Sequence, residues 1–301
     1  VHEDYGIGRF IGTQQRRRRL GDETAAERTA RLRLIEATNF EVIPLRSLDD
    51  ALGDLPAGSW VSVTASPAKG LDTTLEITEK LLAAGHRTVP HISARLVRDP
   101  AHTRAIASWL RATEVGEIFL VAGDVTEPEH YHDALSFLGD LLETDHGLRR
   151  VGVTAYPDGH PLIDRGVLQE ALHAKQATLA EAGLEGYCST QMCFDSARIV
   201  DWLSAERRAG LKLPAHLGIA GVVDRAKLLS IGVRLGIGHS LRYLRKNRRA
   251  VGRLMTVPHY DPNDLLVPLS AHTSALDIRE LHVFTFNQVA ATADWRERNL
   301  R

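Results

Sequence analysis

The stretch VGVTAYPDGHP, residues 151–161, begins as a buried strand and ends in a turn that places a tyrosine and a histidine between prolines. Seven other short apolar runs recur along the chain and alternate with longer segments of helical periodicity. These runs span residues 37–45, 59–66, 87–93, 117–123, 186–192, 214–221 and 280–287. Eight strands, each followed by a helix, predict a (β/α)8 TIM barrel, because parallel strands of this kind close around a filled interior beneath a ring of helices.

An open, doubly wound parallel sheet is the alternative α/β fold. Its first strand-to-helix turn would carry a glycine-rich phosphate loop, and FEVIPLRSLDD (40–50) contains no glycine. Capping residues predict the helix boundaries. We expect one helix to begin at an N-cap, Asp72, and to end at Gly85, and another to begin where Pro100 follows Asp99.

The chain of 301 residues predicts one barrel domain over 36–301, preceded by an N-terminal helical and basic extension over 1–35. The run Arg16–Arg19 in that extension is interpreted as a solvated arm or an oligomer contact, with a grip on phosphate or RNA as the alternative. The stretch 238–280 breaks the alternation and predicts extra helices before the last strand. Its arginines are expected to face solvent, with binding of an acidic substrate tail as the alternative.

Composition favours a small molecule as the substrate or ligand. The formal net charge is -1 with 25% charged residues, which gives no reason to expect nucleic acid or a membrane surface as a partner. No apolar run reaches the roughly 18–20 residues of a membrane span, and we recognise no secretory signal. We therefore expect a cytoplasmic protein, with a homo-oligomer compatible with this composition. Cys188 and Cys193 are expected to be free thiols.

In a TIM barrel the chemistry lies at the C-terminal ends of the strands, where the βα loops converge. In chain order, these ends carry Glu41, Thr64, His91, Asp124, Tyr156 with His160, Gln191, the loop after Gly221, and Asn287. Burying a polar group costs free energy unless the group is hydrogen-bonded, and such a cost is often tolerated where the group serves binding or catalysis. Glu41 lies between apolar residues, where a carboxyl group suits general acid catalysis; the alternative is a salt bridge to an arginine inside the barrel.

Asp124 closes VAGD (121–124) and is interpreted either as a functional carboxylate or as the N-cap of the next helix. His130, His132 and Asp133 superficially suggest a metal site, but imidazoles two residues apart do not share a helix face. We therefore expect a surface helix start there and no metal site in the protein. Residue order alone singles out no Ser-His-Asp or Cys-His arrangement.

Six motifs in order resemble the methylenetetrahydrofolate reductase family. They are NFEVIP (39–44), VPHISAR (89–95), VAGD (121–124), VTAYPDGHP (153–161), STQMCFD (189–195) and LHVFTFN (281–287). The resemblance implies a (β/α)8 barrel that holds FAD at the strand ends. It also implies hydride transfer from NAD(P)H, through the flavin, to 5,10-methylenetetrahydrofolate, giving 5-methyltetrahydrofolate for one-carbon metabolism and methionine biosynthesis.

The resemblance also assigns roles to individual residues. It implies that Glu41 is the general acid that helps to open the imidazolidine ring, that Asp124 lies near both flavin and pterin, and that Gln191 contacts the pterin. The implied FAD contacts are Thr64, His91, Ala122, Gly123, Asp124, Tyr156, His160 and Lys175. The implied folate contacts are Asp124, Gln191, Lys227 and Gln288.

Several positions depart from the family pattern. Ala122 stands where the family usually has an arginine, and LQEALHAKQ (168–176) is largely apolar before Lys175. Lys227 aligns with a second glutamine, Ile231 with a stacking phenylalanine and Gln288 with a substrate arginine. These changes bear on FAD affinity and folate binding, for which Arg95 and Arg225 are candidate replacement cations. Two alternatives follow, namely a folate-dependent methyl transferase or demethylase without a redox cofactor, and a non-catalytic folate-binding homologue.

Overall fold

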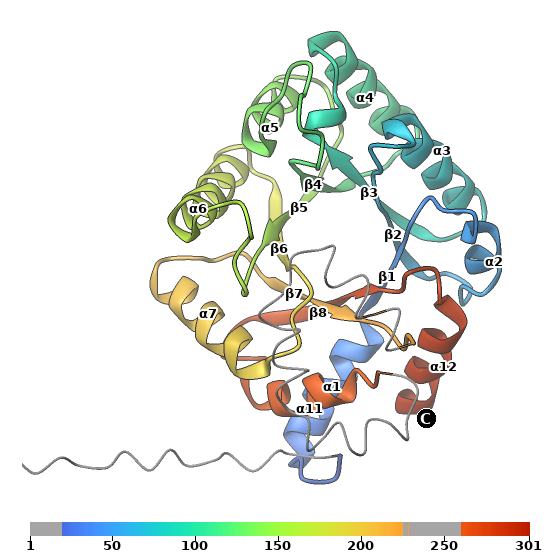
Figure 1. Ribbon diagram of the computed structural model, residues 1–301, viewed down its shortest axis with the longest axis vertical. Helices are drawn as coiled ribbons and strands as arrows, with labels where there is room; N and C mark the ends of the chain where they lie inside the picture. The colour runs from blue at the N-terminus through green and yellow to red at the C-terminus, as the bar shows by residue number, and fades with distance from the viewer. Residues whose placement is uncertain (1–19, 225–227, 229–259) are drawn as a thin grey trace, which may run out of the picture.

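The computed structural model describes residues 20–224, 228 and 260–301 (Figure 1). Eight parallel strands form a closed barrel in chain order, in which the first strand pairs with both the second and the last. The strands are β1 (Thr38–Val42), β2 (Trp60–Val63), β3 (Arg87–Ser93), β4 (Glu117–Val121), β5 (Arg150–Ala155), β6 (Glu185–Thr190), β7 (Ala215–Ala220) and β8 (Ile278–Phe284). The predicted TIM barrel is confirmed, and barrel closure excludes the doubly wound sheet.

Helices surround this barrel (Figure 1). The described α-helices are α1 (Ala25–Glu36), α2 (Leu48–Gly53), α3 (Gly70–Ala83), α4 (Pro100–Ala112), α5 (Ala134–Leu142), α6 (Arg165–Glu181), α7 (Ser196–Arg208), α11 (Asn263–Leu269) and α12 (Val289–Leu300). The short 3-10 helices are η1 (Ala94–Leu96) and η2 (Ser270–His272). Among the described helices, none combines the length and apolar character that crossing a bilayer requires. Of the predicted extra helices before the last strand, α11 and η2 fall within the described residues.

Two predicted helix starts meet different outcomes. Asp99 caps α4 as expected, because its carboxylate accepts a hydrogen bond from the backbone N–H of His102 at 2.7 Å. The prediction of Asp72 as an N-cap is wrong, since α3 already begins at Gly70. The backbone of Gly70 has φ +76°, a turn that glycine makes without steric cost, so the chain enters the helix three residues earlier, with Lys69 at the N-cap position.

The barrel wall and its helices share the main hydrophobic core. Ile118 of β4 and Val151 of β5 belong to the same buried cluster as Leu110 of α4 and Phe137 of α5. Strands that are covered by helices on one side and by the barrel interior on the other are buried on both faces, which explains their continuous apolar runs.

Charged and aromatic side chains fill the N-terminal end of the barrel interior. Glu117 and Arg150 are the first residues of β4 and β5, and Oε1 of Glu117 lies 3.4 Å from Nη1 of Arg150. Nη2 of Arg150 lies 3.3 Å from Oε1 of Glu280, and its guanidinium stands over the Tyr187 ring at 4.4 Å. The ring of His216 stacks on Tyr187 at 3.9 Å. Packed, mutually paired groups occupy this end, which leaves the C-terminal end for a ligand.

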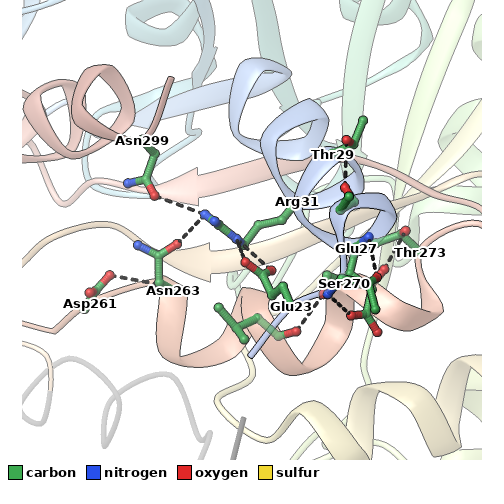
Figure 2. A network of polar contacts seen from close by, with 12 residues as sticks. Glu23, Glu27, Thr29, Arg31, Asp261, Asn263, Ser270, Thr273 and Asn299 are labelled. Carbon is green, nitrogen blue, oxygen red and sulfur yellow. Dashed lines mark hydrogen bonds and ion pairs between the residues drawn. The ribbon is translucent and has the colours of Figure 1, made fainter. Parts of the chain in front are cut away.

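Helix α1 packs against the barrel and ties the start of the described chain to its end. Arg31 is 3% exposed, and its Nε donates to the Glu23 carboxylate at 2.9 Å. Its Nη1 donates to Oδ1 of Asn263 at 3.0 Å and to Oδ1 of Asn299 at 3.1 Å, as Figure 2 shows. The predicted N-terminal extension is therefore packed on the barrel over its described residues, and Arg16–Arg19 lie outside them.

The Arg31→Lys variant should unfold with a free energy about 2 kcal/mol below that of the wild type, because hydrogen bonds to charged groups contribute roughly 1.5–3 kcal/mol. Lysine can keep the ion pair with Glu23, but an ammonium cannot reproduce the fork that reaches Asn263 and Asn299. Urea denaturation measures the change. Arg28→Lys, on the exposed face of the same helix, is the control, and an equal loss in both variants would contradict the role of this network.

Candidate functional site

Glu41 lies in the barrel interior, at the fourth position of the five-residue strand β1, and is 5% exposed. Its Oε2 lies 2.8 Å from Nε2 of His282, a residue of β8 that is 3% exposed. The backbone oxygen of Glu41 also accepts a hydrogen bond from the Thr285 hydroxyl. The carboxylate is thus fixed from the neighbouring strand, and its partner is a histidine rather than the arginine considered from the sequence.

His91 of β3 joins this pair. Its ring centroid lies 4.7 Å from that of Phe119 and 5.6 Å from that of His282. One ligand atom from each of Glu41, His91 and His282 lies within 4.8 Å of the other two, and all three residues are buried. Burial, and then the neighbouring His282, hold the pKa of His91 well below its usual value, so the imidazole is neutral.

Two interpretations made from the sequence concern this cluster. The resemblance implied that His91 contacts a flavin, and the structure places His91 inside the barrel beside the candidate acid. We also expected no metal site, and the structure brings together a carboxylate and two imidazoles. His282 was missed, although a histidine between Leu281 and Val283 in an apolar run was a usable signal.

Asp124 lies just beyond β4 and is exposed. The N-cap interpretation is wrong, because α5 begins at Ala134 and is capped by Asp133, whose carboxylate accepts from two backbone N–H groups. The charge of Asp124 acts instead on two side chains of the turn after β5. Burial raises the pKa of Tyr156, and the charge of Asp124 acts in the same direction. Burial lowers the pKa of His160, and Asp124 opposes that effect.

The turn after β5 holds Tyr156 and His160 together. Their rings meet edge to face with centroids 5.5 Å apart. The N–H of Gly159 donates to the Tyr156 carbonyl at 2.9 Å, and Gly159 has φ +79°. Nε of Arg198 on α7 lies 2.8 Å from Oδ1 of Asp158 and anchors the same turn. This turn therefore holds the tyrosine and the histidine together, within reach of the charge of Asp124.

The backbone of Ala122 and Gly123 directly follows β4. The Ala122 carbonyl accepts from the N–H of Arg95 at 2.9 Å and from the Ser93 hydroxyl at 3.3 Å. Gly123 has φ +94°, and a Cβ added there would lie 1.8 Å from Oγ of Ser93. Only glycine fits this position without a shift of its neighbours.

The Gly123→Ala variant should be destabilised by about 1–3 kcal/mol, the usual cost of a residue held in a rare backbone conformation. The new methyl group should also push Ser93 away from the Ala122 carbonyl. Thermal unfolding measures the loss. Gly139→Ala on α5 is the matched control, because a Cβ there meets nothing within 4 Å, and it should be neutral or slightly stabilising. Similar unfolding temperatures for the two variants would refute the backbone argument.

The other predicted contacts are spread around the mouth. Gln191 follows β6 and is half-buried, with its Oε1 accepting from the N–H of Met192 at 2.8 Å. Thr64 follows β2, and Gln288 precedes α12; both are half-buried. Lys227, together with Arg225 and Ile231, lies outside the described residues.

Asn287 has a structural role. Its Nδ2 donates to the Ile43 carbonyl at 2.9 Å, and its Oδ1 accepts from the N–H of Ile43 at the same distance. It therefore joins the chain after β8 to the chain after β1. An apolar cluster borders the mouth on this side and includes Met192, Phe194, Ala220, Val223 and Phe286, with Ile43 and Phe284 packed against it.

The basic residues proposed for a flavin diphosphate are already engaged or buried. Nε and Nη1 of Arg95 donate to the carbonyls of His132 and Val125 at 2.9 and 3.1 Å, and so hold the loop between β4 and α5. Lys175 of α6 is 7% exposed, and burial lowers its pKa while Asp133 opposes the shift. Ala122 supplies no cation, so neither it nor the buried Lys175 offers an exposed positive charge to a diphosphate.

No protein-family model matches the sequence. Among solved structures, the chain is similar to a Clostridium thermocellum protein that binds two copies of 5-methyl-5,6,7,8-tetrahydrofolic acid, with a TM-score of 0.55 and 13% identity over 89% of this chain and 98% of that one. Dihydropteroate synthases from Xanthomonas albilineans and Thermus thermophilus match with TM-scores of 0.43 and 0.42 at 17% and 16% identity. They cover 88% and 87% of this chain, and 92% and 90% of their own lengths. At these identities, the likeness to the Clostridium thermocellum protein shows a shared TIM-barrel fold.

Proposed function

We propose that the protein is an oxidoreductase that reduces 5,10-methylenetetrahydrofolate to 5-methyltetrahydrofolate with NAD(P)H. The observation that carries the proposal is the buried carboxyl of Glu41, held by His282 in a site where the resemblance assigns binding groups and no nucleophile. The ordered motifs support this reaction. A shared fold with a protein that binds 5-methyltetrahydrofolate supports the folate as the ligand class.

The reaction needs one proton and one hydride. When the acid protonates N10 of the folate, the bond between N10 and the bridging carbon breaks, and the carbon remains on N5 as an iminium. The hydride from NAD(P)H adds to that carbon and leaves NAD(P)+, so atoms and charge balance. Glu41 supplies the proton and so acts as the general acid. His282 is its positioning partner, because it holds the carboxyl oriented toward N10.

The mouth offers complementary groups for a pterin. The carboxylate of Asp124 can accept from the pterin amino and ring N–H groups, and the Gln191 amide can both donate and accept. The apolar cluster at the ends of β6, β7 and β8 can cover the flat ring, although the aligned family position holds Ile231 instead of a phenylalanine. Positioning of this kind is what hydride transfer requires.

FAD enters the proposal through the resemblance alone; if bound, it would supply a relay for the hydride between NAD(P)H and the folate. Thr64, Tyr156 and His160 are the described residues at the mouth that would contact it. The engaged Arg95 and the buried Lys175 do not supply the charge that its diphosphate needs. The chemistry assigned to Glu41 and His282 is the same whether the hydride comes directly or through a relay.

The visible absorption spectrum of the purified protein tests this function, before and after FAD and then with NADH and methylenetetrahydrofolate under anaerobic conditions. A flavin band that bleaches with NADH and returns with the folate would support both half-reactions. A colourless protein that still oxidises NADH when the folate is added would keep the reductase and remove FAD. A protein that oxidises no NADH under any of these conditions would overturn the proposal.

A folate-dependent methyl transferase or demethylase is the second candidate. The observation that favours it is the lack of a free cation for FAD among the described residues we aligned with its contacts, since methyl transfer needs no redox cofactor. Conversion of 5-methyltetrahydrofolate to tetrahydrofolate in the presence of a thiol acceptor, without NADH, would support it. Tight folate binding without either conversion would leave a non-catalytic folate-binding protein.

A further inference from the structure

We propose that Glu41, His91 and His282 form a binding site for a divalent cation of the zinc type inside the barrel. The three residues come from β1, β3 and β8, and they contribute one carboxylate and two imidazoles. Zn2+ sites with two histidines and one glutamate use this donor set, and three protein ligands leave a fourth position open. This inference concerns metal binding and does not rest on the proposed reductase activity.

The spacing of the three ligand atoms suits one ion. They all lie within 4.8 Å of one another, so a common centre lies at most about 2.8 Å from each. Zinc bonds to nitrogen and carboxylate oxygen are about 2.0–2.2 Å long. Side-chain movements of less than about 1 Å per ligand therefore close the site, and the 2.8 Å contact between Glu41 and His282 opens as the ion enters.

An unsatisfied nitrogen gives a second, independent observation. Nε2 of His91 is buried and makes no hydrogen bond with any residue that the structure describes. The residue is 6% exposed, and a buried polar atom without a partner costs free energy. A cation bound at this Nε2 would supply the partner that the nitrogen lacks, in a ring that otherwise meets aromatic neighbours.

The surroundings favour a transition metal over magnesium or calcium. Two imidazoles suit Zn2+, Co2+ or Ni2+, whereas Mg2+ and Ca2+ prefer all-oxygen sites. The rings of Phe119 and Phe284 lie 5.7 and 5.2 Å from His282, so the walls around the cluster are partly aromatic and apolar. Such walls exclude water and strengthen the attraction between the cation and the carboxylate.

The other histidine-rich segment serves as the control. His130 and His132 are exposed on the loop before α5, and the carboxylate of Asp133 is used as the cap of that helix. A surface contribution to metal binding from this loop can be removed without touching the barrel interior. The variant for this purpose is His130→Asn combined with His132→Asn.

Cobalt titration of the full chain, after removal of metals with a chelator, tests the site. Co2+ should bind with one-to-one stoichiometry and give a visible d–d band that is characteristic of a low coordination number. Zn2+ should displace the Co2+ and abolish the band. X-ray absorption of the zinc-loaded wild type should count two imidazoles with oxygen as the remaining ligands. Absence of the band, or a coordination shell without two imidazoles, would overturn the proposal.

Single substitutions assign the ligands. His91→Asn should weaken Co2+ binding by more than about 100-fold, beyond the 10–100-fold that loss of a supporting residue costs. The His130→Asn and His132→Asn double variant should bind as the wild type does. Equal binding by all of these proteins would place the metal elsewhere and refute the site. Should His91→Asn fail to fold, the X-ray absorption count on the wild type still decides.

Discussion

Replacing Glu41 by glutamine should lower the rate of methylenetetrahydrofolate reduction by about 10²–10⁴-fold, the range that a positioned acid contributes. Glutamine has nearly the same shape and can accept a hydrogen bond from His282, so the fold should persist. It cannot release a proton to N10, so the ring stays closed and no iminium forms. Oxidation of NADH with an artificial acceptor does not need this proton and should remain near the wild-type rate.

The two rates measured side by side in stopped-flow or steady-state assays check the role of Glu41. Glu280→Gln is the matched control, because Glu280 is a carboxylate of β8 at the opposite end of the barrel, where it pairs with Arg150 and His216. That change should lower stability and leave folate reduction intact in the folded protein. Equal losses of folate reduction and acceptor reduction in Glu41→Gln would remove Glu41 from the acid step.

Metal binding gives this experiment a second use. A cation bound to Glu41 prevents the carboxyl from holding a transferable proton, so Zn2+ should inhibit folate reduction while sparing reduction of the artificial acceptor. The reductase and the metal site therefore fail separately. Inactive protein that binds Co2+ through two imidazoles would retain the site without the reaction, and active protein that binds no Co2+ would retain the reaction without the site.

The barrel could be predicted from the sequence because its signals are local. Each strand is a short apolar run followed by a helical pattern. Eight such units can close into a barrel, in which the backbone hydrogen-bonding groups of every strand are paired on both edges. The start of α3 was placed wrongly because Asp72 is a good cap in isolation, whereas the turn at Gly70 decides where the helix begins. Asp124 was considered as a cap for the next helix, but that helix, α5, begins only at Ala134 and is capped by Asp133.

The sequence predicted where along the strands the residues of the candidate site lie, but it did not predict which side chains contact one another. Glu41 could be singled out because burying a carboxylate in an apolar strand costs free energy unless the group is paired or functional. Its position near the C-terminal end of β1 is where a TIM barrel carries its chemistry. Its partner His282 is separated from it by 241 residues, and only closure of β8 onto β1 brings the two together. The engagement of Arg95 with loop carbonyls likewise depends on loop geometry, so a cation near a strand end in sequence need not face the ligand.

Acidification should destabilise the protein through His216. This residue is 2% exposed, and burial lowers its pKa to about 4 even though Glu280 opposes the shift. The groups that face it are Glu280 at 3.0 Å, Arg150 at 3.1 Å, the stacked Tyr187 ring and the edge-to-face Trp60 ring. The unfolded chain gains a proton here near pH 6.5, whereas the native state stays neutral until about pH 4. Stability is therefore full above pH 6.5 and falls as the pH drops toward 4.

The expected loss is about 3 kcal/mol over that window, at about 1.4 kcal/mol for each pH unit. Urea unfolding at several pH values between 7 and 5 should show this slope. Glu280 stays ionised in this range, because burial raises its pKa but His216 and Arg150 together lower it by more. His216→Gln removes the titrating group and retains a polar side chain. The variant should therefore take up one proton fewer on unfolding than the wild type, and its stability should fall less steeply as the pH drops. The same pH dependence in both proteins would mean that His216 accepts its proton without unfolding, and that the paired groups at the N-terminal end of the barrel tolerate an added positive charge.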